Sequence, residues 1–129
     1  MYNYIKDLLC KQTNNVNQAK YICRIRYNYQ SLDMSSNLLT LSSNMFVGLS
    51  SLTGLYLSSN GISKLVPGAF NGLTLLEEIN LGSNNIPEIP KNAFHGLSSL
   101  VKLSLFFNQI KKIDSGAFNG LNRVVELNL

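Results

Sequence analysis

The chain has 129 residues, of which 45% are hydrophobic and 14% charged, and this length suffices for one domain or for two very small ones. The apolar fraction is normal for a folded protein and argues against disorder along the whole chain. No apolar run reaches the roughly 18–20 residues that cross a bilayer, so we expect no transmembrane helix in this chain. Composition therefore predicts a small soluble unit with a formal net charge of +4.

The first 28 residues carry the excess of positive charge. One acid, Asp7, stands against five bases, whereas bases and acids are equal in number from residue 29 onward. The five bases are Lys6, Lys11, Lys20, Arg24 and Arg26. One interpretation is a patch for nucleic acid, heparin or anionic lipid. We favour the other, the solvated surface of a terminal cap, because a few scattered bases follow a phosphate backbone poorly.

Two short elements are predicted within this N-terminal segment. Residues 1–12 place Ile5, Leu8 and Leu9 on one side of a short helix. Residues 21–27 alternate apolar and polar side chains, which is the pattern of a strand.

From residue 29 the chain repeats itself in steps of 24 residues. Each complete unit reads L-x-x-[LI]-x-L-x-x-N-x-I-x-x-[LI]-x-x-x-A-F-x-G-L. The complete units cover residues 52–75, 76–99 and 100–123, after a shorter unit over 29–51 and before a partial one over 124–129. Such repetition predicts a solenoid, in which each unit buries its apolar face against the next one.

A short strand is predicted in every unit. In Leu55-x-Leu57 the two leucines are two positions apart, so both point to one face of the strand. The same spacing recurs in Ile79/Leu81, Leu103/Leu105 and Leu127/Leu129. One strand cannot bury this face alone, but stacked copies form a continuous core.

Two columns of side chains are expected along the stack. An asparagine follows each strand, and because its amide both donates and accepts, it can form a ladder of bonds to the backbone of its own and neighbouring coils. The ladder residues are Asn37, Asn60, Asn84 and Asn108. The second column is apolar, and each of its buried rings contributes roughly 1.5–3 kcal/mol. Its members are Phe46, Phe70, Phe94 and Phe118.

This pattern resembles the leucine-rich repeat family over about residues 29–129. The 24-residue unit with A-F-x-G-L is similar to the typical subclass, found mainly in extracellular proteins of animals such as Toll-like receptors, Slit-type guidance proteins and small matrix proteoglycans. The resemblance implies an α/β fold, namely a right-handed solenoid with a short-stranded parallel β-sheet on the concave face and loops, turns or short helices on the convex side. It also implies that the concave sheet binds proteins or other ligands.

The residues between the inward leucines are expected to face out on the concave side. The central row is Asp33, Tyr56, Asn80, Ser104 and Asn128; one flanking row is Ser31, Gly54, Glu78, Lys102 and Glu126; the other is Ser35, Ser58, Gly82 and Phe106. Glu78, Lys102 and Glu126 alternate in charge across neighbouring strands. They form either a recognition strip or, as we favour, a surface ladder that neutralises itself and contributes under about 1 kcal/mol.

Phe106 and Phe107 depart from the repeat. The matching positions elsewhere are Ser35-Ser36, Ser58-Ser59 and Gly82-Ser83. Exposed aromatic side chains are typical anchors of protein interfaces. The alternative is that one ring folds over the rim and packs locally. Together with Tyr56 and Lys102, the two rings form the predicted partner-contact patch.

The end of a solenoid needs a cap, and residues 1–28 are the candidate. The resemblance implies a cap with four cysteines, whereas this chain has two, Cys10 and Cys23. A disulfide between them would stabilise the fold by roughly 3 kcal/mol and indicate an oxidising compartment. The alternative is two reduced thiols in a cytosolic chain. With His95 far away in the sequence, these cysteines do not make a four-ligand zinc site, so no metal is expected.

No catalytic set is visible in the sequence. His95 lies in a variable turn position of the repeat, where the other units have Val47, Asn71 and Asn119. Neither a Ser/His/Asp nor a Cys/His arrangement is supported by the spacing, and there is no phosphate-binding loop or H-E-x-x-H motif. We therefore predict a non-enzymatic protein without a cofactor.

Both ends of the chain suggest a fragment of a longer ectodomain. The first thirty residues lack the apolar stretch of a secretory signal, and none of the Asn residues begins an N-x-[ST] sequon. The chain stops at Leu129, within a predicted strand. We expect Leu127 and Leu129 to face an open core end, whose edge strand invites self-association.

Three classes of function fit these observations. The first is a recognition module of a cell-surface or secreted receptor or adhesion protein, acting in innate immunity, adhesion or signal transduction. The second is a matrix or structural repeat protein, and the third an intracellular adaptor in the cytoplasm. We expect a protein ligand or co-receptor on the concave face and no nucleic acid. The predicted contacts are Tyr56, Glu78, Asn80, Lys102, Ser104, Phe106 and Phe107.

Overall fold

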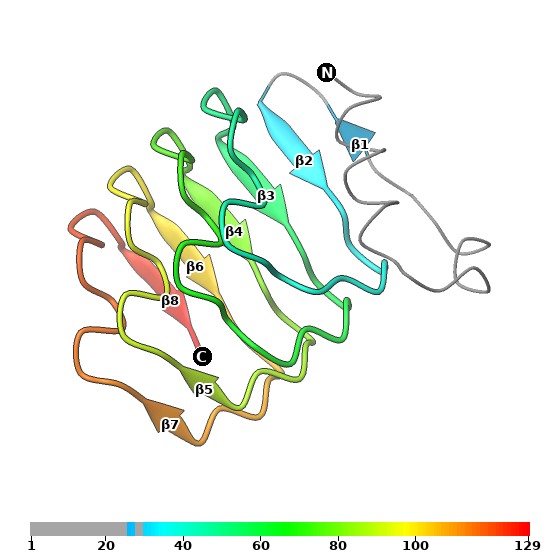
Figure 1. Ribbon diagram of the computed structural model, residues 1–129, viewed down its shortest axis with the longest axis vertical. Coiled ribbons are helices and arrows are strands. Elements are labelled where there is room, and N and C mark those ends of the chain that lie inside the picture. The colour runs from blue at the N-terminus through cyan, green and yellow to red at the C-terminus, as the bar shows by residue number, and fades with distance from the viewer. Residues whose placement is uncertain (1–25, 28–29) are drawn as a thin grey trace.

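The structure is a computed structural model that describes residues 26–27 and 30–129. The strands are β1 (Arg26–Tyr27), β2 (Ser31–Asp33), β3 (Gly54–Tyr56), β4 (Glu78–Asn80), β5 (Glu88–Ile89), β6 (Lys102–Ser104), β7 (Lys112–Ile113) and β8 (Glu126–Asn128). From β2 onward, the strands of the main sheet lie on successive turns of one coil, and β5 and β7 lie apart from them on the same turns as β4 and β6 (Figure 1). Four predictions lie outside the described residues: the cap-like segment 1–28 except for β1, its basic side chains, the helix over 1–12 and the pairing of Cys10 with Cys23.

One six-stranded sheet runs the length of the coil in the order β1-β2-β3-β4-β6-β8. From β2 onward the strands are parallel, as predicted, and Leu55 pairs with Ile79, which in turn pairs with Leu103. These register partners are 24 residues apart, so the sequence repeat is also the repeat of the sheet. The predicted strand over 21–27 is present at Arg26–Tyr27, where β1 pairs antiparallel with β2.

The connections on the far side of the coil are tight turns rather than helices in the part of the chain that the structure describes. Bonds between residues three apart close these turns, such as Leu49 N–H to the Phe46 carbonyl and Leu73 N–H to the Phe70 carbonyl. A two-stranded parallel sheet, β5 with β7, adds a second short ladder away from the main sheet. Of the loops, turns or short helices that the resemblance implied, the turns are what these residues form.

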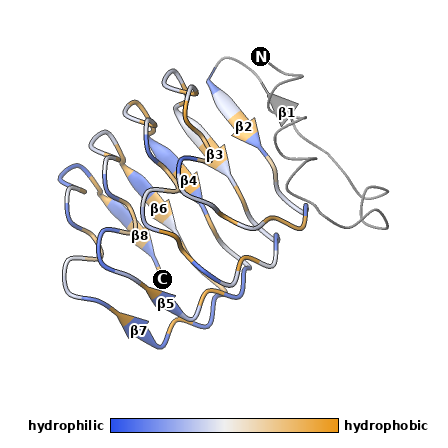
Figure 2. Cartoon of the chain, viewed as in Figure 1, coloured by the Kyte–Doolittle hydropathy of each residue, from blue (hydrophilic) through white to orange (hydrophobic). Residues whose placement is uncertain are grey.

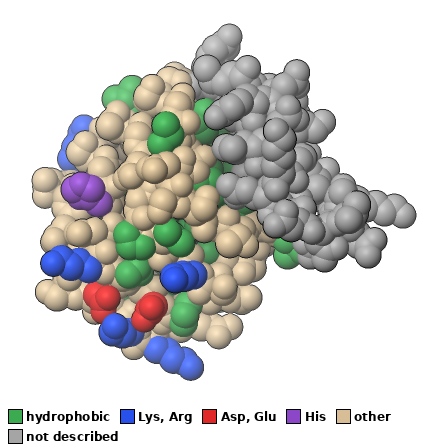
Figure 3. Space-filling model, viewed as in Figure 1, with side chains coloured by type: hydrophobic (Ala, Val, Ile, Leu, Met, Phe, Trp, Pro, Cys, Tyr) green, Lys and Arg blue, Asp and Glu red, His purple; other side chains and the backbone are tan. Residues whose placement is uncertain are grey.

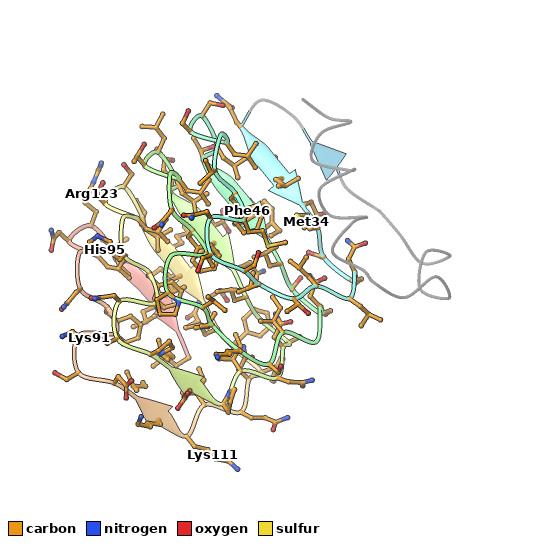
Figure 4. The ribbon with its side chains drawn as sticks, viewed as in Figure 1. Met34, Phe46, Lys91, His95, Lys111 and Arg123 are labelled. Atoms are coloured by element: carbon orange, nitrogen blue, oxygen red, sulfur yellow. The ribbon has the colours of Figure 1, made fainter. Side chains whose placement is uncertain are left out.

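The core is a continuous apolar layer between the sheet and the turns. The inward residues of β2, β3, β4 and β6 are at most 1% exposed, and hydrophobic residues recur at matching places of successive coils (Figure 2). Met34 and Phe46 lie in this layer, whereas Lys91, His95, Lys111 and Arg123 project from the outside of the coil (Figure 4). The core ends at β8, where Leu127 and Leu129 are 43% and 58% exposed.

The asparagine column forms the expected kind of ladder inside this core. The Asn84 side chain accepts the N–H groups of Asn60 and Ile62, both at 3.0 Å, and donates to the carbonyls of Leu57 and Leu81. The side chains of Asn37, Asn60 and Asn108 bond the backbone in related ways. Asn60, Asn84 and Asn108 thereby tie their coils to the coil before, and the first two of these side chains are buried.

The phenylalanine column sets the curvature of the coil. Its rings are stacked nearly parallel, with centroids 6.1 Å apart at each of the three steps. Hydrogen-bonded strands, by contrast, are only about 4.8 Å apart. Because the coil advances less per unit at the sheet than at the rings, the sheet lies on the inner side of the curve. This geometry places the outward side chains of the strands on a concave surface.

Candidate partner-binding face

The predicted contact residues lie on one surface, the solvent side of the six-stranded sheet, which we call the sheet face. Its central row is set by register, since Tyr56 pairs with Asn80 and Asn80 with Ser104. A flanking row pairs Glu78 with Lys102. Phe106 and Phe107 follow β6 at the end of its row. The sheet therefore collects side chains from three coils on a single surface.

The middle of the sheet face is a shallow polar floor. Asn80 is half-buried, and its Oδ1 atom accepts the N–H of Gly82 at 2.9 Å. Asp33 does the same for Ser35 on the first coil. These bonds fix the outgoing turn of each strand, and Ser104, also half-buried, adds only a small side chain. The taller side chains stand on either side of this floor.

The charged row is only partly a neutral ladder. Lys102 Nζ lies 3.5 Å from Glu126 Oε2, and both side chains are about half exposed, so the pair contributes little stability. Glu78, the other cross-strand neighbour of Lys102, instead accepts a hydrogen bond from the Tyr56 hydroxyl at 3.1 Å. Lys102 therefore forms an ion pair with one acidic neighbour, Glu126, while the other, Glu78, bonds Tyr56.

Tyr56 is held against the sheet by the glycine two residues before it. A Cβ atom at Gly54 would lie 3.2 Å from the Tyr56 hydroxyl oxygen and 3.3 Å from a ring carbon, so the ring lies back over its own strand. Partial burial and the nearby carboxylates of Glu78 and Asp33 raise the pKa of Tyr56 above its ordinary value. The hydroxyl therefore remains a neutral donor to Glu78 at physiological pH.

An open recess of about 320 Å³ lies beside this tyrosine. Its floor is Gly54, and its walls include Tyr56, Glu78 and Lys102. The Tyr56 ring occupies the place where the flanking row has no side chain, at Gly54, between Ser31 on one neighbouring strand and Glu78 on the other. Both an aromatic ring and carboxylates therefore line this recess.

Phe106 packs locally, which is one of the two alternatives raised by the sequence. A Cβ atom at Gly82 would lie 2.6 to 2.9 Å from three carbons of the Phe106 ring, so the ring covers Gly82 on the preceding coil. Gly82 is consequently buried, and Phe106 is 36% exposed. Gly54 and Gly82, each a member of one flanking row, are both buried because an aromatic ring lies against each of them.

Phe107 remains in solvent. Its side chain is 83% exposed and meets Phe106 edge to face, with ring centroids 5.3 Å apart. Its φ angle is +53°, in the left-handed region, and the matching residues Ser36, Ser59 and Ser83 have the same backbone conformation. This conformation costs an L-residue roughly 1–2 kcal/mol, and bulky residues rarely adopt it. An exposed aromatic ring thus occupies the strained position that small serines fill elsewhere.

Sequence reasoning did not anticipate the two glycine–aromatic pairs. The available signal is a glycine in a row that is otherwise polar, with an aromatic residue two positions later or one coil further on. On the opposite side of the coil, His95 is exposed. Within residues 30–129, no group of three or more metal-ligating side chains converges, and no helix is long and apolar enough to cross a membrane.

The profile of the leucine rich repeat family matches residues 50–110, the part of the chain that forms the central coils of this sheet. This match, together with the fold, identifies residues 50–110 as leucine-rich repeats. No protein with a curated description matches the chain. Solved structures do match it and show the same solenoid.

Two of these structures show how similar the matching proteins are and how much of each chain the match covers. A chain of the Toll–Spatzle complex, described as a hub in Drosophila development and innate immunity, is 25% identical with a TM-score of 0.69, over 76% of this chain and 13% of that one. Human 5T4, also called Wnt-activated inhibitory factor 1 or trophoblast glycoprotein, is 27% identical with a TM-score of 0.71, over 81% and 39%. This leucine-rich repeat chain therefore spans well under half the length of either similar protein.

Proposed function

We propose that this chain is a non-enzymatic recognition module that binds a protein ligand or co-receptor through the sheet face. The observation that carries the proposal is Phe107, an aromatic side chain that is 83% exposed on a left-handed backbone position. Exposed aromatic anchors are typical of interface hot spots, and the matching positions of the other coils hold serine. Phe106, Tyr56 and Lys102 surround the same concave surface.

The similar structures support a protein as the partner. The Drosophila structure is a complex of Toll with Spatzle. A shallow floor with aromatic and charged side chains at its borders also fits a protein surface better than an enclosed small-molecule site, which is usually a deep apolar pocket. Asn80 and Ser104 are proposed as polar contacts in the middle of that interface.

We propose an extracellular or cell-surface location as part of a longer receptor or adhesion protein, with roles in innate immunity, adhesion or signal transduction. The alternatives are a matrix protein and a cytoplasmic adaptor. Thiol labelling of the chain isolated from its own cells separates the locations, because a disulfide between Cys10 and Cys23 forms in an oxidising compartment, whereas free thiols indicate the cytosol.

Selection from a displayed library of random peptides tests the proposed binding face. The chain and two variants are immobilised: Phe107→Ser on the sheet face, and Arg123→Ser on the outer turns as a control that is also exposed. We expect the selected peptides to be retained by the control and lost from Phe107→Ser. Peptides that bind Phe107→Ser as well as the parent chain would place recognition elsewhere and overturn the proposal.

A second proposal concerns the edge strand β8, whose inward residues Leu127 and Leu129 are exposed. An unpaired edge with apolar side chains can pair with a second copy of the chain. Sedimentation of the parent chain and of Leu127→Lys at several concentrations tests this: the parent is expected to associate and the variant to remain monomeric. Identical monomeric sedimentation of both would exclude it.

A further inference from the structure

The charges of the described repeats are separated between the two sides of the coil. On the sheet side of the coils from β2 to β8, four acids, Asp33, Glu77, Glu78 and Glu126, stand against one base, Lys102, while β1 adds Arg26 beside Asp33. The remaining charged side chains comprise five bases and two acids. In the view of Figure 3, Lys and Arg side chains lie over the outer turns and near β5 and β7. The repeats are neutral as a whole, but the sheet face is acidic.

The recess beside Gly54 has the chemistry of a site for a cationic side chain. Glu78 presents a carboxylate that is already oriented by the Tyr56 hydroxyl at 3.1 Å. Lys102, the base at the recess, is held 3.5 Å from Glu126 on the far side from Glu78. The Tyr56 ring offers an aromatic face, which attracts guanidinium and ammonium groups. A cation in the recess therefore meets both a carboxylate and a ring.

The recess and the aromatic pair both contact the coil that contains β4, at different points along it. Glu78 lines the recess, and the Phe106 ring covers Gly82, four residues further along the same coil. Four residues of extended chain span about 13 Å. In an extended partner segment, side chains four positions apart also point to the same face, because the period of a strand is two.

We propose that the sheet face binds an extended protein segment that carries a basic and an apolar side chain four positions apart. The basic side chain enters the recess that Tyr56 and Glu78 line, and the apolar one packs on Phe106 and Phe107. This inference rests on the proposed function and names the partner class: a basic, locally apolar segment rather than an acidic one. Charge complementarity with the acidic sheet face selects that partner.

Synthetic peptides test this pairing directly. Each carries one arginine and one leucine in a neutral serine and threonine background, two, four or six positions apart, and binding to the chain is measured by fluorescence anisotropy. We expect the four-position peptide to bind tightest, because only that spacing reaches both sites from one face. Replacement of its arginine by glutamate is expected to lower affinity tenfold or more, as a charge-assisted bond is lost and a repulsion added.

Two variants of the chain provide a matched pair. Glu78→Gln removes the carboxylate at the recess, whereas Glu88→Gln removes the same charge from β5, away from the sheet face. We expect Glu78→Gln to weaken the arginine peptide about tenfold and to leave its serine counterpart unchanged, and Glu88→Gln to change neither. A third variant, Tyr56→Ser, is expected to weaken binding of the same arginine peptide by removing the ring.

The possible failures are distinguishable. Equal weakening by Glu78→Gln and Glu88→Gln, absence of a spacing preference, or absence of binding by the arginine peptides each overturns this inference. Library peptides that depend on Phe107 but show no basic residue also overturn it, while the proposed function stands. Library peptides that are indifferent to Phe107 overturn the proposed function itself.

Discussion

At the scale of single residues, polar atoms inside the coil depend on a few side chains. Asn84 is 4% exposed and satisfies backbone groups from two coils. A buried donor or acceptor that loses its partner costs about 1–3 kcal/mol, since water cannot replace the bond. The asparagine column therefore contributes more to stability than its surface area suggests.

We predict that Asn84→Ala lowers the free energy of unfolding by at least about 3 kcal/mol, because several buried backbone groups lose their partner together. Asn85→Ala is the matched control, since that side chain is exposed and its backbone N–H still reaches the Ile62 carbonyl. The control is expected to change stability by less than about 0.5 kcal/mol. Urea denaturation measures both, and equal effects would contradict the role of the ladder.

The raised pKa of Tyr56 gives a prediction at alkaline pH. Because the folded chain disfavours the phenolate, the group leaves stability unchanged below its ordinary pKa of about 10, and stability falls as pH rises from there through the folded pKa. Glu78→Gln is expected to lower the pKa of Tyr56, since it removes the main charge that opposes ionisation.

The tyrosinate absorbance of the chain, compared with that of Tyr56→Phe, isolates this single titration from the other tyrosines. The expected result is a component that titrates later than the rest in the parent chain and earlier in Glu78→Gln. A Tyr56 titration that is unmoved by Glu78→Gln would show that the two side chains do not interact in solution.

At the scale of elements, the repeat fixes what the backbone does and leaves the outer side chains undetermined. Strand positions, parallel pairing and the two columns follow from the 24-residue period, because inward residues and ladder residues recur at fixed offsets. The covering of Gly54 by Tyr56 and of Gly82 by Phe106 depends on rotamers, which periodicity does not encode. The recess was missed for the same reason, since it arises from where one ring lies.

The stack of rings is an element of its own, and its members are unequal. Phe94 is fully buried between two rings, whereas Phe118 is only partly buried and has one ring neighbour. We predict that Phe94→Ala costs about 3–5 kcal/mol, as large core truncations do, and that Phe118→Ala costs roughly half as much. Equal thermal destabilisation by the two substitutions would contradict a column that is stabilised by stacking from both sides.

At the scale of the whole molecule, the coil presents two chemically different surfaces. The inner curve carries the acidic sheet face with its aromatic border. The outer turns carry most of the bases, among them Lys91 and Lys111 (Figures 3 and 4). The net charge of the sequence conceals this separation, because the excess bases belong to residues 1–28 and the repeats sum to zero. This separation of acids from bases became visible only when the strand register showed on which side of the coil each side chain lies.

The central claim is that recognition takes place on the sheet face. An NMR titration of the chain with a peptide selected on it tests this most directly, because every amide reports its own contact. The account predicts that the shift changes gather at Tyr56, Ser104 and Phe107 and leave the outer turns near His95 and Arg123 unmoved. Changes that gather on those outer turns, with the sheet face unmoved, would contradict it.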